Sequence, residues 1–235
     1  MTVAAPRPSA RIYHTDVAAF RDARWDDLIT ERDQAALSPS AQPRRKTEHF
    51  AGRALLRVAL QDWTGEPALS HSLRADANGR PECIGGPQLS IAHSGGFVVC
   101  ALAATAPIGI DVELPVERRT IDGIAERYFS AEENRWIGSR PERFYMLWVL
   151  KEAHLKALGV GLAGGLSALR CVIEPPRIEA TVEDSGDAPE LALYEMADGF
   201  LGIAMLGRRL DTLTAHRWTP GAPLCAAPLA LVAQT

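Results

Sequence analysis

The sequence lacks a long uninterrupted run of apolar residues. Its longest apolar stretch, residues 97–110, is interrupted by Pro107 and is shorter than the roughly 20 residues with which an α-helix crosses a bilayer. The N-terminal segment MTVAAPRPSARIYH has no apolar run behind a basic start, so a signal peptide is not expected. We therefore expect a soluble, cytoplasmic protein that does not bind membranes.

Closely spaced cysteines are also missing. The four cysteines, Cys83, Cys100, Cys171 and Cys225, form no CxxC pair, which argues against a zinc or redox motif. Two of them lie in apolar runs that predict strands. We interpret the four as reduced thiols in the core.

Neither charge dominates the sequence. The 25 basic and 29 acidic residues give a formal net charge of -4, which excludes a nucleic-acid binder that relies on a broad positive surface. Any basic site must therefore be local. With 235 residues, 47% of them hydrophobic, the chain can form one large domain or two small ones.

Helical and alternating patterns define the first half of the chain. The segment RRKTEHFAGRALLRVALQDW has apolar residues at helical spacing and is followed by Gly65 and Pro67, which predicts a long amphipathic helix. Residues 88–91 and 97–103 predict a hairpin with His93 in its turn. In residues 108–114 the alternation predicts a strand with two distinct faces. One face holds Ile108, Ile110, Val112 and Leu114, and the other holds Gly109, Asp111 and Glu113.

The second half repeats the pattern of a long helix followed by strands. Ser130 and Glu133 match a capping box, so a helix should begin at Ser130. A longer helix should run from Pro141 to Leu158 and end at Gly159. The strands expected beyond it are residues 169–173, 191–196, 200–206 and 213–218. The Ala/Pro-rich end, from about residue 220, suggests a loosely held tail.

Asp111 and Glu113 are two carboxylates on one face of a strand that otherwise reads as buried. Burying them is costly unless a positive charge neutralises them, and Mg²⁺ with phosphate oxygens would do so. The alternative is an edge strand with both acids in water.

The segment WVLKEAHLKALG places Glu152 and Lys156 four residues apart on one helix face, with Lys151 next to Glu152. An ordinary exposed ion pair is one reading. Trp148 lies one turn earlier on the same face, which favours partial burial and a third carboxylate for the metal. Spacing alone assigns no ligand to four further cationic side chains, and a surface or structural role would explain each of them: His93, Arg45, Arg53 and Arg80.

Taken together, the segments GIDVE (109–113), WVLKEAHLKALG (148–159), SIAHS (90–94) and GRP (79–81) resemble the signature of 4′-phosphopantetheinyl transferases of the surfactin-synthetase-activating type. The segment RRKTEHFAGRALLR resembles, in particular, the siderophore-associated bacterial members. The resemblance implies an α+β fold with two similar subdomains related by a pseudo-twofold axis, each a small antiparallel sheet packed with a long helix. Residues 1–105 and 106–235 would form these subdomains of a monomer, with coenzyme A between them.

The resemblance also implies roles for individual residues. Asp111, Glu113 and Glu152 resemble magnesium ligands, and Lys156 and Lys151 resemble contacts to the coenzyme A phosphates. His93 resembles the ligand of the 3′-phosphate, assisted by Arg45 and Arg53. Arg80 replaces the usual lysine of G-K-P, and arginine differs from lysine in geometry; its expected contact is with the nucleotide.

The implied reaction is attack by a carrier-protein serine on the β-phosphorus of coenzyme A, which expels 3′,5′-ADP. Glu152 would act as the base, directly or through a metal-bound water, and Lys156 would stabilise the leaving group. The partners would be acyl, polyketide or peptidyl carrier proteins. They would dock between Glu113 and Arg143, where Arg118, Arg119 and Arg127 lie.

Two alternatives belong to other classes of protein. A metal-independent hydrolase with two carboxylates predicts an aromatic-rich sugar cleft, but only 6% of the residues are aromatic. An inactive carrier-binding relative predicts the loss of an acidic ligand, yet all three acids and Lys156 are present.

Overall fold

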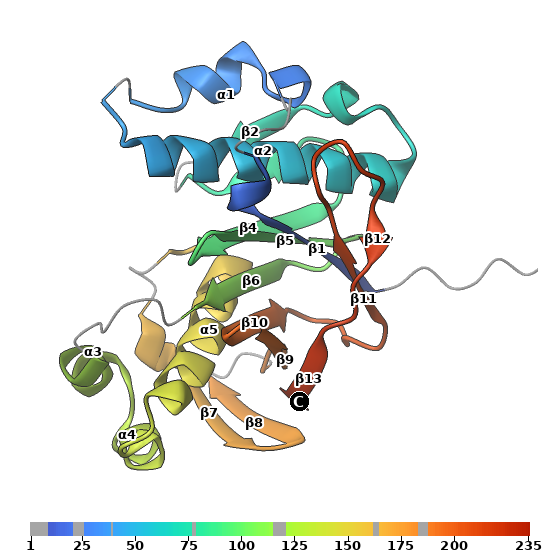
Figure 1. Cartoon of the computed structure of the whole chain (residues 1–235). Coiled ribbons are helices and arrows are strands. Elements are labelled where there is room, and N and C mark those ends of the chain that lie inside the picture. The colour runs from blue at the N-terminus through green and yellow to red at the C-terminus, as the bar shows by residue number, and fades with distance from the viewer. Residues whose placement is uncertain are drawn as a thin grey trace, which may run out of the picture.

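The computed structural model describes residues 9–20, 26–38, 40–76, 79–114, 121–161, 165–182 and 188–235. These residues form two large β-sheets and a small two-stranded one, and a long helix lies on the outer face of each large sheet (Figure 1). The α+β class expected from the sequence is confirmed.

The helices are α1 (Glu31–Ala35), α2 (Pro43–Thr64), α3 (Ile121–Tyr128), α4 (Ala131–Ile137) and α5 (Pro141–Leu158). The strands are β1 (Ala10–Asp16), β2 (Leu73–Ala75), β3 (Pro81–Cys83), β4 (Gln88–Ser94), β5 (Phe97–Ala103), β6 (Ile108–Glu113), β7 (Leu169–Glu174), β8 (Arg177–Val182), β9 (Glu190–Met196), β10 (Gly199–Met205), β11 (Leu213–Arg217), β12 (Cys225–Ala226) and β13 (Ala230–Gln234). None of the helices in these described ranges is both long enough and apolar enough to span a membrane.

The first sheet has the strand order β12-β11-β1-β5-β4. The predicted helix α2 is confirmed: Pro43 lies in its first turn and Gly65 ends it. Its buried leucines, among them Leu55 and Leu60, share one hydrophobic cluster with Val98 of β5. The apolar face of α2 therefore seals the outer side of this sheet.

The hairpin of β4 and β5 is confirmed, but its turn is shorter than expected. Ser94 pairs with Phe97, and His93 pairs with Val98 inside the ladder. Gly95 and Gly96 form the turn with φ angles of 57° and 90°, which a two-residue hairpin turn requires and glycine adopts without strain. The prediction that His93 lies in the turn is therefore wrong; it is a strand residue near the end of β4.

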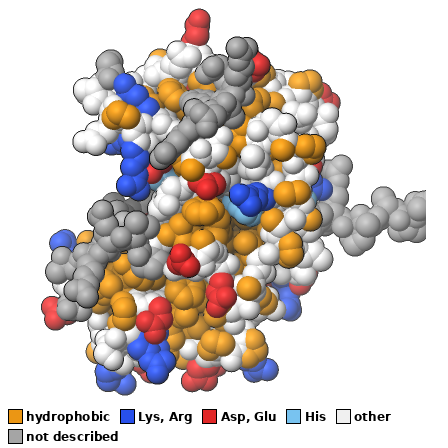
Figure 2. Space-filling model, in the orientation of Figure 1, with side chains coloured by type: hydrophobic (Ala, Val, Ile, Leu, Met, Phe, Trp, Pro, Cys, Tyr) orange, Lys and Arg blue, Asp and Glu red, His pale blue; other side chains and the backbone are white. Residues whose placement is uncertain are grey.

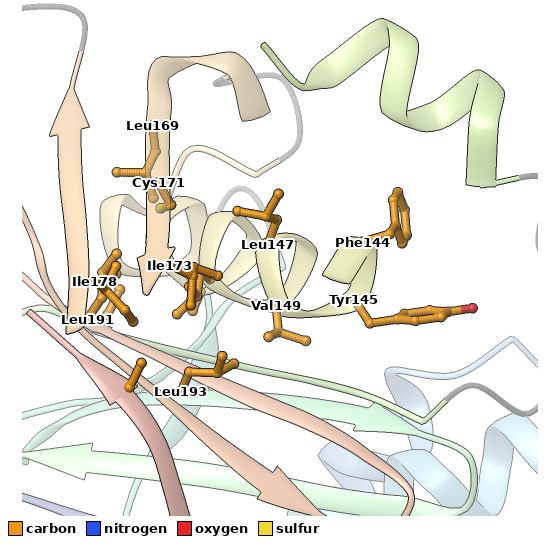
Figure 3. Packing of buried hydrophobic residues seen from close by; sticks show 14 of the residues in the cluster. Phe144, Tyr145, Leu147, Val149, Leu169, Cys171, Ile173, Ile178, Leu191 and Leu193 are labelled. Atoms are coloured by element: carbon orange, nitrogen blue, oxygen red, sulfur yellow. The ribbon is translucent and has the colours of Figure 1, made fainter. Parts of the chain in front are cut away.

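The second sheet has the strand order β6-β10-β9-β13-β8-β7. Figure 3 shows Val149 of α5 pointing toward the strand that carries Leu193, and both belong to one hydrophobic cluster with Ile173 of β7. Phe144, from the same helix, packs against Phe129, with the ring centroids 5.3 Å apart. The predicted capping box at the start of α4 is also present, because Ser130 and Glu133 each accept the other's backbone N–H.

A second hydrophobic cluster joins the two sheets. Ile12 of β1 and Val99 of β5 pack with Ile108, Ile110 and Val112 of β6. The alternation predicted for residues 108–114 is confirmed, because this face of β6 turns toward the other sheet while the face with Gly109 turns toward α5. The core thus has the layers α2, first sheet, second sheet and α5.

The end of the chain is built into both sheets. β11 pairs with β1 in parallel, and β12 pairs with β11. β13 lies between β9 and β8 in the second sheet. The Ala/Pro-rich segment that suggested a loosely held tail therefore contributes two strands. The division of the chain at residue 105 stays a prediction. β11 and β12 come after this residue, yet they belong to the first sheet together with β1, β4 and β5.

The four cysteines are all free thiols. Cys100 and Cys171 are buried, as expected, but Cys83 is half-buried and Cys225 is exposed. The prediction of a core position is wrong for these last two. Cys225 lies in β12, an edge strand of two residues, and Cys83 is the last residue of the three-residue β3. Side chains on such short strands are not covered by neighbouring elements on both faces.

Candidate functional site

The candidate site lies where β6 touches α5. A Cβ atom at Gly109 would overlap the carbonyl oxygen of Ala153, so the strand backbone and the helix backbone are in direct contact there. Because the side chain is missing at Gly109, the next two residues on the same face of β6, Asp111 and Glu113, come close to the last turns of α5. The glycine of the GIDVE segment therefore sets the approach of strand and helix.

Asp111 and Glu113 are buried in the fold. Their exposed fractions are 7% and 9%, and Lys156 Nζ lies 2.6 Å from Asp111 Oδ1. The alternative of an edge strand with both acids in water is therefore wrong. β6 does form the edge of its sheet, but α5 covers the face that carries the acids.

Glu152 belongs to the same charge cluster. Burial raises the pKa of Glu152 to about 7; the negative charge of Asp111 adds to this, Lys156 opposes it and Glu113 contributes a smaller increase. Lys156 bonds to Asp111 of the strand, so it does more than form an ion pair along the helix. Asp111, Glu113 and Glu152 are thus three neighbouring carboxylates, and Lys156 is the cation beside them.

The donor set suits a hard divalent cation. The described residues contain no group of three or more His, Cys, Asp or Glu side chains already arranged around a metal position. Asp111, Glu113 and Glu152 nevertheless offer only oxygen donors, which Mg²⁺ prefers. Burial is the main reason that the pKa of Glu152 is raised, and the negative charges of Asp111 and Glu113 add to it; a cation beside the three carboxylates would favour their charged forms. The donor set of these three carboxylates therefore fits a divalent cation such as Mg²⁺.

His93 and Arg45 lie on accessible parts of the first half. The His93 side chain is 57% exposed, and its Nδ1 atom lies 3.6 Å from Glu48 Oε2 on α2. Arg45 is exposed in the first turn of α2. His93 precedes Ser94, whose hydroxyl donates to Glu113 Oε2 over 3.0 Å. The exposed histidine is therefore adjacent in sequence to a residue that touches the acidic cluster.

Arg53 lines a pocket with a volume of about 430 Å³. Two further arginines, Arg32 and Arg74, also line it, and Asp33 lies 3.6 Å from Arg53 Nε. The sequence analysis missed Arg32 and Arg74 because they come from α1 and β2, and no local spacing relates these segments to α2. The pocket offers several guanidinium groups to an anion.

Arg80 lies between the two sheets and is half-buried. Its guanidinium donates to the carbonyl oxygens of Leu89 and Ile108 over 3.4 and 3.3 Å. These bonds join the start of β4 to the start of β6. The structure thus shows a linking role, and contact between Arg80 and a nucleotide stays a prediction.

The prediction that Lys151 binds coenzyme A is wrong. Its side chain is fully buried, and Nζ lies 2.9 Å from Glu133 Oε1. The ammonium group also donates to the carbonyl oxygens of Leu166 and Leu169, so all its protons are used. Lys151 precedes Glu152 by one residue, which is a step of about 100° around the helix, and its side chain therefore points into the core.

Comparison with known proteins decides the family. One family model, described as the 4′-phosphopantetheinyl transferase N-terminal domain, matches residues 33–103. A second, described as the 4′-phosphopantetheinyl transferase superfamily, matches residues 107–196. The chain belongs to the 4′-phosphopantetheinyl transferase superfamily. All three carboxylates of the cluster and Lys156 lie within the second match.

The similarity to individual members of this superfamily indicates that the chain is of the Sfp type. A 4′-phosphopantetheinyl transferase of Bacillus pumilus is 38% identical over 125 residues, which are 50% of this chain and 52% of that protein. The Sfp protein of Bacillus subtilis is 30% identical over 119 residues, which are 47% and 51% of the two chains. The chain thus spans about half the length of these relatives. A solved holo-[acyl-carrier-protein] synthase of Thermotoga maritima matches with a TM-score of 0.37 at 29% identity, over 44% of this chain and 64% of that one.

Proposed function

We propose that the protein transfers the 4′-phosphopantetheine group of coenzyme A to a serine of an apo carrier protein, with Mg²⁺ as its metal ion. The observation that carries this proposal is the cluster of Asp111, Glu113, Glu152 and Lys156 at the contact of β6 and α5. It combines oxygen donors for a cation with a lysine for phosphate, and it lies inside the region that matches the superfamily.

Glu152 is the proposed base. The serine oxygen forms a bond to the β-phosphorus of coenzyme A, the bond from that phosphorus to the bridging oxygen breaks, and 3′,5′-ADP leaves with the electron pair. The serine proton passes to Glu152, a partly buried carboxylate of the cluster, which can act as a general base. Mg²⁺ held by Asp111, Glu113 and Glu152 would supply positive charge to the phosphate oxygens.

Lys156 is proposed to stabilise the leaving group. Its ammonium group lies 2.6 Å from Asp111 Oδ1, and its side chain is 30% exposed, so it can turn from the carboxylate to an incoming phosphate. A cation placed at the oxygens where charge grows lowers the barrier more than one that binds the ground state alone.

The adenosine end of coenzyme A is proposed to bind along α2. His93 is exposed beside Glu48 of α2, Arg45 is exposed at the start of the helix, and Arg53 lines the arginine pocket together with Arg32 and Arg74. These cations would hold the 3′-phosphate, because charge-assisted bonds to phosphate are the stronger class of hydrogen bond.

The carrier protein is proposed to dock near α3. Figure 2 shows hydrophobic side chains gathered over the centre of the lower half of the molecule, where α5 lies in Figure 1, with α3 to the left of them. Arg127 is exposed on α3, and its guanidinium lies over the Tyr128 ring at 5.3 Å. Arg118 and Arg119 lie outside the described residues.

We also propose that the enzyme is a cytoplasmic monomer and that its carriers are of the acyl, polyketide or peptidyl type.

Intact-mass measurement tests the reaction. The purified protein is incubated with coenzyme A, Mg²⁺ and a panel of apo carrier proteins, with an EDTA sample beside it. We expect one carrier or more to gain the mass of one phosphopantetheinyl group, and EDTA to abolish the gain. No gain on any carrier, although coenzyme A binds, would contradict the proposal.

A further inference from the structure

Two serines of β4 bridge to β6, although the two strands belong to different sheets. The backbone N–H of Ile110 donates to Ser90 Oγ over 3.1 Å. The backbone N–H of Leu114 donates to Ser94 Oγ over 3.2 Å. The hydroxyl groups thus accept N–H groups that a neighbouring strand's carbonyls would accept in a continuous sheet.

The alternation of β4 explains this placement. Ala92 belongs to the cluster between the sheets, together with Ile110, whereas Leu89 and Ile91 belong to the cluster beneath α2. Successive side chains of a strand point to opposite faces, so Ser90 and Ser94 share the face of Ala92. His93 falls on the opposite face, beside Glu48 of α2.

Ser94 makes a second hydrogen bond in addition to the one with the backbone N–H of Leu114. Its hydroxyl oxygen lies 3.0 Å from Glu113 Oε2. Because an ionised carboxylate only accepts hydrogen bonds, the hydroxyl proton points at Glu113 while the oxygen accepts from Leu114. A hydrogen bond to a charged acceptor is stronger than a neutral one, and it fixes the rotation of this buried carboxylate.

We propose that Ser94 is a positioning residue that orients Glu113 for the divalent metal ion. The inference rests on the metal site of the proposed function and adds to it a residue from the other sheet. Groups that hydrogen-bond to metal ligands set the orientation of those ligands and contribute to metal affinity. Because Ser94 follows His93, the strand that would contact the 3′-phosphate also orients a metal ligand.

Ser90 provides a matched control. Ser90→Ala removes the acceptor for the backbone N–H of Ile110 in β6, and Ser94→Ala removes that for Leu114, directly after β6. Both variants should therefore lower the midpoint of chemical denaturation. Ser94→Ala alone removes the bond to Glu113. Ser94→Thr keeps a hydroxyl group at the position and serves as the conservative variant.

The test uses Mn²⁺ as the metal probe, with binding to the full-length protein in the presence of coenzyme A followed by electron paramagnetic resonance. We expect Ser94→Ala to weaken Mn²⁺ binding by about 10-fold and to raise the Mg²⁺ concentration needed for half-maximal transfer. Ser90→Ala should bind Mn²⁺ as the wild type does, and Ser94→Thr should recover most of the loss.

Unchanged Mn²⁺ affinity in Ser94→Ala, with the same loss of stability as Ser90→Ala, would overturn the positioning role and leave the metal site standing. A wild-type protein that binds no Mn²⁺ with coenzyme A present would overturn the metal site, and the role of Ser94 with it. The two failures are therefore distinguishable.

Discussion

Two lysines on the same helix differ in role because of the direction in which each side chain points. Lys156 lies beside Asp111 and is 30% exposed, whereas Lys151 is fully enclosed with Glu133. The sequence alone does not show which of them is buried, since both lie in WVLKEAHLKALG, Lys151 one residue and Lys156 four residues from Glu152. Only the packing of α5 on β7 and α4 shows which lysine is structural.

Replacing Lys151 should therefore affect stability. Lys151→Met leaves the Glu133 carboxylate buried without its cation, which should lower the free energy of unfolding by about 3–5 kcal/mol. Lys156→Met, at a partly exposed site, should change it by about 1 kcal/mol or less. Urea denaturation of both variants measures the difference. A Lys151→Met protein of normal stability with weakened coenzyme A binding would restore the original prediction.

The proposed contact between His93 and the 3′-phosphate can be tested by comparing coenzyme A with a substrate that lacks this phosphate. His93→Ala removes a group proposed to contact the 3′-phosphate, so kcat/KM for coenzyme A should fall by about 10-fold, the value of one charge-assisted bond. Dephospho-coenzyme A lacks that phosphate, and its kcat/KM should be the same for both enzymes. An equal fall with both substrates would show that His93 acts elsewhere.

At the scale of elements, the contact of β6 with α5 assembles the site. Gly109→Ala would force the strand away from the helix, because the new methyl group meets backbone atoms of Ala153, which cannot rotate aside. We expect at least a 10-fold loss of kcat together with about 2 kcal/mol of stability, the usual range for overpacking.

Gly123 on α3 is the control for this substitution. A Cβ atom there meets open space, so Gly123→Ala should raise stability by up to about 1 kcal/mol through helix propensity. Thermal denaturation and the transfer assay are run on both variants. Wild-type activity in Gly109→Ala would show that the close contact is not needed.

The elements that the sequence predicts well are those whose signals are local. The capping box at Ser130, the stop at Gly65 and the alternation of residues 108–114 each depend on a few neighbouring residues, and the structure confirms them. β1 and β13 were not predicted, because their pairing partners lie far away in the chain. β8 was not predicted although its partner β7 directly precedes it, because Ile178 is the one buried residue of this strand. In the site, the carboxylates could be found by motif, whereas Ser94, Arg32 and Arg74 depend on tertiary contacts.

At the scale of the whole molecule, a hydrophobic cluster and several polar contacts hold the two sheets together. Arg80 joins β4 to β6, and Ser90 and Ser94 do the same by their hydroxyl groups. β11 carries the second half of the chain back beside β1. Residues proposed for the 3′-phosphate and for the metal thus come from different sheets, and no single segment of sequence holds the full site.

Docking of an acidic carrier surface should depend on charge at α3. Arg127→Glu places a negative charge where a basic contact is proposed, so the KM for the carrier should rise by about 5- to 10-fold, since like charges slow association. The KM for coenzyme A should stay constant. Arg177→Glu, an exposed change on β8 at the far end of the sheet from β6, controls for net charge. Equal carrier KM values in both variants would remove support for docking at α3.

The central claim, that the cluster at β6 and α5 carries out the transfer, is tested most directly with Glu152→Gln in the intact-mass assay. Glutamine keeps the size of the side chain but neither accepts the serine proton nor offers a charged oxygen to the metal. We expect the rate of transfer to fall by at least 100-fold, while calorimetry shows that coenzyme A still binds. Glu179→Gln, an exposed change on β8, should transfer at the wild-type rate. Transfer by Glu152→Gln at the wild-type rate, with the same dependence on Mg²⁺, would contradict the account.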